Sequence, residues 1–244
     1  MKKLVFQVDI PGPEGHTLLS HNTPIYTLSK SKAKKYAKKC GADYLCLTTD
    51  KYCPGWAAHF QKFAITDKHF DKYDMILWVD SDLVIYEHTP SIFDFAERRD
   101  EIFFATIEDH MARIDLLPNY FNSGYMLFKR EMIDKLHGWE DVYNVNRYYK
   151  SKLGEQHAFN KIVYDYHPEY FKLSRHFNST GQLTRLYSIH FTGIGKKHFT
   201  PEKAVRWEEK ALKLFNNLNQ LEFKDSFYEW RPVVPIEKIM KKLF

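Results

Sequence analysis

Short apolar runs alternate with helical patterns along the first third of the chain. Residues 23–41 repeat apolar positions at the spacing of an amphipathic helix and end at Gly41, a residue favoured at helix C-termini. Residues 55–70 predict a second helix. Strand, helix, strand, helix, strand at these intervals indicates βαβ units, an α/β fold and a largely parallel sheet. The predicted strands cover residues 3–10, 43–49 and 75–80.

The third of these strands is apolar at every position from Met75 to Val79. A strand with one solvated face alternates polar and apolar residues, so this strand is expected at the centre of the sheet, covered on both sides. The chain continues with a short helix at residues 155–165 and, from Thr200, a long helix with Pro201 at its first position. Further strands are predicted at residues 101–107, 123–130 and 187–193.

Two carboxylates, Asp80 and Asp82, follow directly where this apolar strand ends. Ligands bind at the carboxyl ends of the strands in open α/β sheets, so a functional site is expected here. In an extended segment both side chains point to the same side, and a cation, a shared proton or solvent must relieve their repulsion. A divalent metal would do so. An exposed turn with two solvated acids is the alternative interpretation.

Three later segments carry polar residues suited to the same site. His190 ends a predicted strand, and imidazole is a good ligand for transition metals; a surface histidine in a basic loop is the alternative. The glycines after it let backbone approach a ligand, and the lysines can neutralise phosphate. Asn122–Gly124 come just before a predicted strand, and Glu155–Gln156 open a predicted helix, where acidic and polar residues are also ordinary. The glycines and lysines after His190 are Gly193, Gly195, Lys196 and Lys197.

The composition limits the class of protein without identifying it. The 244 residues, 44% of them hydrophobic, suit one large domain or one domain with a small appendage. The net charge of +5 suits an anionic substrate or a membrane surface, and no nucleic-acid-binding signature accompanies it. Three cysteines without a CxxC pair predict neither a disulfide framework nor a zinc knuckle. With no signal peptide and no run near the roughly 20 apolar residues of a membrane span, we expect a soluble, cytoplasmic protein.

Four motifs in chain order resemble those of the retaining GT-A glycosyltransferases, most closely family 8, which includes glycogenin and bacterial lipopolysaccharide galactosyltransferases. They are ILWVDSDLVI, FNSGYMLF, EQHAFN and HFTGIGKKHF. The resemblance spans about residues 1–200, and families 6 and 34 have comparable segments. The chain departs from the family 8 pattern at Lys197, where proline is usual, at Phe199, where tryptophan is usual, and at His157, which replaces an acid. Its first loop also differs from the usual nucleotide-binding sequence.

The resemblance implies a GT-A fold, Rossmann-like with a mainly parallel central sheet and flanking helices, over residues 1–199. Residues 200–244 are then a short helical extension packed on it. The resemblance also implies a metal held by Asp80, Asp82 and His190, and a nitrogen ligand among carboxylates favours Mn²⁺, with Mg²⁺ as the alternative. Contacts with the donor, expected to be a UDP-sugar, are implied for Asp9, Lys62, Asp80, Ser81, Gly193 and Lys196.

The implied reaction moves a hexose from the nucleotide diphosphate to a hydroxyl of a glycan, a lipid-linked sugar or a protein. Gln156 matches the position of a nucleophile, and because an amide is a poor nucleophile we expect front-face attack with retention. Gln156 then stabilises the oxocarbenium-like state, Glu155 holds sugar hydroxyls, and Asn122 completes the predicted catalytic set. Two alternatives stay open: a nucleotidyltransferase acting on a sugar phosphate, and a catalytically inactive domain that binds glycan or nucleotide sugar.

The last residues form a second amphipathic pattern. A short helix that makes weak peripheral contact with a membrane has this pattern. A final helix that packs on the domain has it too, and this second interpretation is favoured. The apolar positions, with three lysines on or beside the opposite face, are Ile236, Ile239, Met240 and Leu243.

Overall fold

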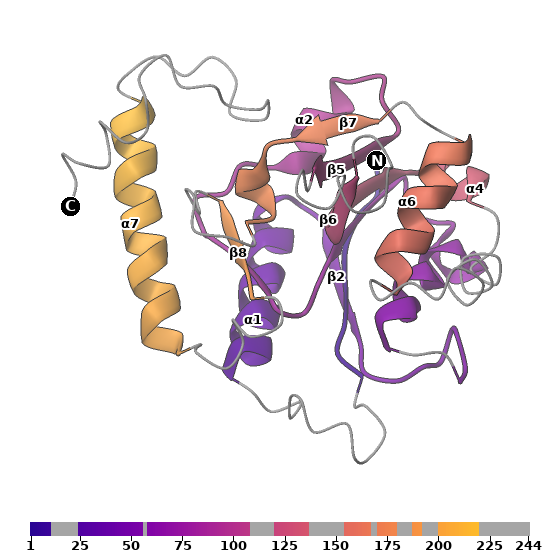
Figure 1. The fold of residues 1–244 in the computed structure, drawn as a ribbon, viewed down its shortest axis with the longest axis horizontal. Coiled ribbons are helices and arrows are strands. Elements are labelled where there is room, and N and C mark those ends of the chain that lie inside the picture. The colour runs from indigo at the N-terminus through magenta and orange to yellow at the C-terminus, as the bar shows by residue number, and fades with distance from the viewer. Residues whose placement is uncertain are drawn as a thin grey trace.

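A six-stranded sheet, with helices on both faces, forms the centre of the computed structural model (Figure 1). Its strand order is β2-β1-β3-β6-β5-β7, and a separate small sheet pairs β4 (Leu83–Ile85) with β8 (Ser188–His190). The six strands are β1 (Lys3–Val8), β2 (Asp43–Leu47), β3 (Met75–Val79), β5 (Phe103–Ile107), β6 (Phe121–Lys129) and β7 (Phe171–Leu173). The structure describes residues 1–10, 24–55, 58–107, 120–136, 154–166, 170–179, 187–191 and 200–219.

Strand β6 runs against the other five strands of the central sheet. It pairs antiparallel with β3 and β5, whereas β1 pairs parallel with β2 and β3, and β5 pairs parallel with β7. The prediction of a mainly parallel sheet is therefore confirmed. Because β6 is reversed, its first residues lie beside the carboxyl end of β3, where the N–H of Asp80 donates to the C=O of Gly124 at 2.8 Å. Asn122–Gly124, predicted just before a strand, lie inside β6.

Strand β3 lies in the middle of the core, as its apolar run predicts, and all five of its residues are buried. Ile76 and Trp78 pack into the apolar cluster formed with η1, α4 and α6. Leu77 and Val79 pack into the cluster formed with α1 and α2 on the other face. Packing on both faces fixes the end of β3, from which Asp80 emerges. The α-helices are α1 (Pro24–Lys39), α2 (Ile92–Glu97), α4 (Arg130–Lys135), α6 (Glu155–Tyr166) and α7 (Pro201–Asn219).

The two helices predicted between the first strands have different outcomes. Helix α1 is present, and Gly41 after it has a φ of 64°, as its predicted capping role requires. The α-helix predicted for residues 55–70 is wrong in type, because its described part forms two 3₁₀ helices, η1 (Ala58–Thr66) and η2 (Lys68–Phe70). Asp67 separates them, since its side chain accepts a hydrogen bond from the backbone N–H of the second residue of η2 and caps that helix.

Five described elements have no counterpart in the sequence predictions: β4, β7, α2, α4 and the 3₁₀ helix η3 (Arg175–Phe177). Each is three to six residues long, too short for a hydrophobic period to show. Strand β4 matters most for the site, because its pairing with β8 sets Leu83 opposite His190 across more than a hundred residues of chain.

Helix α7 packs beside α1 and the small sheet (Figure 1). The Trp207 ring stacks on Phe191 with centroids 5.7 Å apart, and Glu208 accepts a hydrogen bond from Lys32 of α1 at 2.7 Å. The domain boundary at residues 199 and 200 stays a prediction, and the amphipathic stretch at residues 236–244 lies outside the described residues. Among the residues that the structure describes, no helix has both the length and the apolar character needed to cross a membrane.

Candidate functional site

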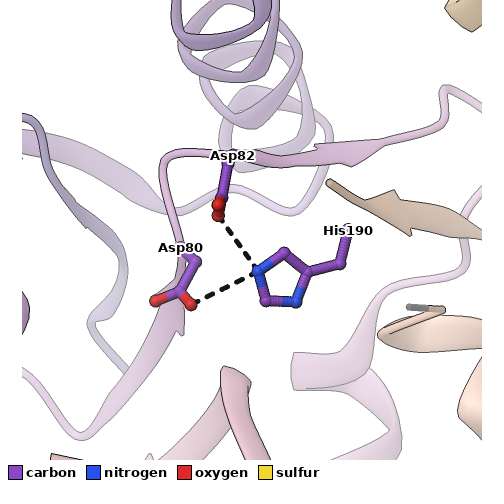
Figure 2. A group of neighbouring side chains, drawn as sticks. All are labelled: Asp80, Asp82 and His190. Carbon is purple, nitrogen blue, oxygen red and sulfur yellow. Dashed lines mark hydrogen bonds and ion pairs between the residues drawn. The ribbon is translucent and has the colours of Figure 1, made fainter. Parts of the chain in front are cut away.

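The two aspartates lie in a tight turn between β3 and β4. The N–H of Leu83 donates to the C=O of Asp80 at 3.0 Å, which closes the turn. The sequence argument placed Asp80 and Asp82 in one extended segment, and this is wrong because the chain turns to enter the small sheet. Both carboxylates nevertheless face the imidazole of His190, which β8 delivers through its antiparallel pairing with β4 (Figure 2).

Asp80, Asp82 and His190 form a group suited to a divalent cation (Figure 2). His190 Nε2 lies 3.0 Å from Asp82 Oδ1 and 3.5 Å from Asp80 Oδ2. Neighbouring ligands at about 2.1 Å from an octahedral ion lie about 3 Å apart, so these spacings fit one ion. Asp82 and His190 are buried, and Asp80 is half-buried. Two carboxylates this close repel each other, and a cation among them removes that repulsion.

A buried lysine lies on the other side of Asp80. Lys62 of η1 is 2% exposed, and its Nζ lies 2.6 Å from Glu155 Oε1 and 3.6 Å from Asp80 Oδ1. It donates to Ser123 Oγ at 3.2 Å and lies 5.0 Å from the centre of the Trp78 ring. Burial lowers the pKa of Lys62, but the two carboxylates outweigh burial and hold the pKa above its ordinary value. The ammonium is thus a fixed positive charge between two acids.

The first turn of α6 supplies Glu155 and Gln156. Burial raises the pKa of Glu155, but the adjacent ammonium outweighs burial, so the pKa lies below its ordinary value and the group is ionised at neutral pH. Gln156 Oε1 accepts a hydrogen bond from the backbone N–H of Ser123 at 3.1 Å. Asn160 ties the same helix to β6 by bonding both the N–H and the C=O of Phe121, at 2.7 and 2.8 Å. These bonds hold the predicted catalytic pair against β6.

Two asparagines lie behind the imidazole. Asn122 Oδ1 accepts hydrogen bonds from the N–H of Gly124 at 2.8 Å and from Asn178 Nδ2 at 2.6 Å. Asn178 Oδ1 lies 2.9 Å from His190 Nδ1. The sequence analysis missed Asn178, which follows the 3₁₀ helix η3 (Arg175–Phe177). A single asparagine in a loop carries no sequence signal of its own, and only the fold brings it to His190.

Of the remaining residues predicted to contact the donor, the structure describes Asp9 and Ser81 but not Gly193 and Lys196. Asp9 lies on the same edge of the sheet as Asp80, because β1 and β3 pair in parallel with Phe6 opposite Trp78. Its buried carboxylate bonds the ammonium of Lys30 on α1. Ser81 is half-buried in the turn between the aspartates. Gly193 and Lys196, predicted to contact the donor, lie outside the described residues, as do Gly195 and Lys197.

Solved structures show a shared fold at low sequence identity, whereas no protein-family profile and no curated sequence matches the chain. A glycosyltransferase involved in glycosylation of the major capsid of PBCV-1 superposes with a TM-score of 0.56 at 13% identity, covering 87% of this chain and 100% of that one. The galactosyltransferase LgtC, in complex with donor and acceptor sugar analogs, gives 0.54 at 12%, covering 98% and 100%. An LgtC active-site mutant with glutamine changed to glutamate gives 0.56 at 10%, covering 88% and 95%. The chain therefore has the predicted GT-A glycosyltransferase fold.

Proposed function

We propose that the chain is a metal-dependent glycosyltransferase that moves a hexose from a UDP-sugar to an acceptor hydroxyl with retention of configuration. The observation that carries the proposal is the meeting of Asp80, Asp82 and His190 at the end of a buried strand in a GT-A fold. LgtC, which shares the fold, forms a complex with donor and acceptor sugar analogs, and this supports the same classes of ligand here. We assign the chain to family 8, with families 6 and 34 as alternatives, and residues 1–199 to the catalytic domain.

The proposed metal ligands are Asp82, His190 and Asp80, and their single nitrogen favours Mn²⁺ over Mg²⁺. A divalent cation bound there stabilises the negative charge that builds on the leaving diphosphate. Asp80 uses its two oxygens separately. Its Oδ2 faces the imidazole, while its Oδ1 accepts a hydrogen bond from Trp78 Nε1 at 2.8 Å. The carboxylate is therefore oriented by the protein itself before any ligand binds.

The buried lysine prepares the sugar side of the site. Lys62 keeps Glu155 ionised, so this carboxylate can accept hydrogen bonds from sugar hydroxyls. Lys62 was predicted to contact the donor, and we propose that it acts on the donor through Asp80, whose carboxylate lies 3.6 Å from its Nζ. Asn122, on β6 between these groups, is proposed to contact the donor sugar.

The proposed chemistry is front-face substitution. The bond between the anomeric carbon and the diphosphate oxygen breaks, and the acceptor oxygen bonds to the same face of that carbon. The acceptor proton passes to the leaving diphosphate oxygen. Gln156 stabilises the positive charge that builds on the sugar through Oε1, the negative end of its amide, which also accepts the hydrogen bond from the N–H of Ser123 that holds it in place. An active-site mutant of LgtC has a glutamine replaced by glutamate, and this supports a glutamine at the active site of the present chain.

A donor screen on the full chain tests this function. We expect at least one UDP-hexose to release UDP in Mn²⁺ and none to do so in EDTA. With a glycan acceptor, NMR of the product should show the anomeric configuration of the donor. Release of pyrophosphate from UTP and a sugar 1-phosphate would instead indicate a nucleotidyltransferase. Thermal stabilisation by a UDP-sugar without turnover on any acceptor would indicate an inactive binding domain. Either result would overturn the proposal.

A further inference from the structure

His190 must present one particular nitrogen to serve as a metal ligand. Its Nε2 faces Asp82 and Asp80, as Figure 2 shows, and its Nδ1 faces Asn178. A neutral imidazole carries hydrogen on one nitrogen and a lone pair on the other, so only one tautomer can bind a cation through Nε2. The group that bonds Nδ1 therefore decides whether the histidine is ready for a metal.

The polarity of the chain of hydrogen bonds behind His190 is fixed at one end. The backbone N–H of Gly124 can only donate, so the Asn122 atom 2.8 Å from it must be the amide oxygen. The Asn178 atom 2.6 Å from that oxygen must then be the amide nitrogen, because two oxygens cannot bond there. The other end of the same amide is Asn178 Oδ1, which lies 2.9 Å from Nδ1 and accepts its hydrogen. In the neutral imidazole the lone pair is then left on Nε2, 3.0 Å from Asp82 Oδ1, where a cation between the two atoms would bind both.

Packing holds the imidazole ring of His190 in place, in addition to the hydrogen bonds that set its tautomer. His190, Asn178 and Asn122 are 6%, 5% and 6% exposed, so water has little access to compete for these bonds. A Cβ added to Gly124 would lie 2.5 Å from Cε1 of His190 and 2.9 Å from Asn122 Oδ1. The φ of Gly124 is outside the left-handed region, so this glycine provides room for the imidazole and the asparagine rather than an unusual backbone conformation.

We propose that Asn178 is a positioning residue for the metal centre: with Asn122, it transmits the polarity of the Gly124 amide to His190 and presents Nε2 as a ligand. The inference rests on the proposed function in one respect, that the aspartate pair and His190 take a divalent cation. It adds that Asn122, predicted as part of the catalytic set, also sets the state of the metal histidine. Strand β6 thus serves the metal site and the sugar site together.

The test measures Mn²⁺ binding to the full chain, without donor, from the electron paramagnetic resonance signal of free Mn²⁺. Asn178→Leu keeps the branching at Cγ and removes the acceptor for Nδ1–H, so Mn²⁺ binding should weaken by about 10–100-fold. The nitrogen modulation of the electron spin echo, which reports imidazole on Mn²⁺, should weaken with it. Asn178→Asp keeps an oxygen for Nδ1–H and should retain both signals, although its second oxygen faces Asn122 Oδ1 without a hydrogen between them and should lower the melting temperature.

A second pair of variants, at Asn122, tests the same chain of hydrogen bonds even if Asn178→Leu fails to fold. Asn122→Asp still accepts from Gly124 and Asn178 and should bind Mn²⁺ at least as well as the wild type. Asn122→Leu breaks the chain of bonds and should bind more weakly. Asn160→Leu is the matched control, because Asn160 is a buried asparagine that bonds β6 but is not part of this chain. It should lower the melting temperature and leave Mn²⁺ affinity unchanged.

The outcomes separate this inference from the proposed function. If the wild type binds Mn²⁺ through nitrogen and releases UDP, but the folded leucine variants bind Mn²⁺ as tightly as it does, the role of Asn178 is refuted while the proposed function stands. If the wild type shows no nitrogen modulation from bound Mn²⁺, both are refuted. Equal loss of affinity in Asn160→Leu would reduce the effect to general destabilisation and also refute the positioning role.

Discussion

Two clusters of charged residues meet at Asp80, and they differ in how the negative charge of their carboxylates is compensated. In the metal cluster, the described residues bring together two carboxylates and an imidazole, a group that could hold a cation (Figure 2). In the lysine cluster, the ammonium of Lys62 lies 2.6 Å from Glu155 and already compensates it. Asp80 belongs to both clusters, with Oδ2 facing His190 at 3.5 Å and Oδ1 facing Lys62 at 3.6 Å.

We therefore expect variants in the lysine cluster to change mainly stability and variants in the metal cluster to change mainly activity. The positive charge of the lysine cluster is part of the chain, so removing it leaves an uncompensated buried acid and should destabilise the fold. In the metal cluster, the compensating charge is proposed to be a cation from solution, so removing a ligand should abolish the reaction and leave the fold largely unchanged. Each variant below tests one side of this contrast.

Asp82→Asn should have the largest effect on activity. It removes a ligand oxygen charge while keeping the shape of the side chain, and we expect Mn²⁺-dependent turnover to fall by at least about 1000-fold. The melting temperature in EDTA should not fall by more than a few degrees, because the substitution also relieves repulsion from Asp80. Initial rates with the best UDP-sugar and a thermal melt measure the two effects. Wild-type activity in this variant would contradict the metal assignment.

Lys62→Met should have the largest effect on stability. Glu155 then stays buried without its partner, and we expect the free energy of unfolding to fall by about 3–5 kcal/mol in urea titrations with EDTA. Adding Glu155→Gln should restore much of that loss, since the uncompensated charge disappears. Exposed ion pairs contribute at most about 1 kcal/mol. If the unfolding free energy of Lys62→Met alone lies within about 1 kcal/mol of the wild-type value, the pair behaves as an exposed one, which contradicts its burial.

Gln156→Ala should have an intermediate effect, confined to turnover. If the amide only stabilises positive charge on the sugar, kcat should fall by about 10–100-fold, or about 1.4–2.7 kcal/mol, with little change in donor affinity. Rapid-quench kinetics and donor titration distinguish the two parameters. A covalent sugar adduct trapped on the wild-type enzyme, at Glu155 or elsewhere, would refute front-face attack.

The pH dependence of Glu155 should give the smallest effect. Its pKa in the folded chain is lowered from 4.5, so its charge adds stability above the unfolded value and loses it as the pH falls through the folded value. The difference in unfolding free energy between wild type and Glu155→Gln should therefore be greatest near neutral pH and shrink below pH 4.5. Urea titrations from pH 7 to pH 3 measure it, and a difference that grows on acidification would mean that the pKa is raised.

The sequence predicts the parts of the site that local pattern determines. The apolar run of β3 marks a buried central strand, and the aspartates at its end mark the functional edge. The turn at Asp80, given only as the alternative interpretation, has neither glycine nor proline to mark it, and β4 was missed because three residues show no period. The role of Asn178 depends on contacts with β6 and β8 that exist only after folding. No periodicity along the chain indicates them.

The central claim is that Asp82, His190 and Asp80 hold the cation on which the leaving diphosphate depends. A crystal grown with UDP and Mn²⁺, measured at the manganese absorption edge, tests it most directly. We predict one anomalous peak bonded to Asp82 and to His190 Nε2, in contact with the diphosphate, and no peak in Asp82→Asn. A structure with UDP bound beside these residues and manganese absent, or coordinated by other residues, would contradict the claim.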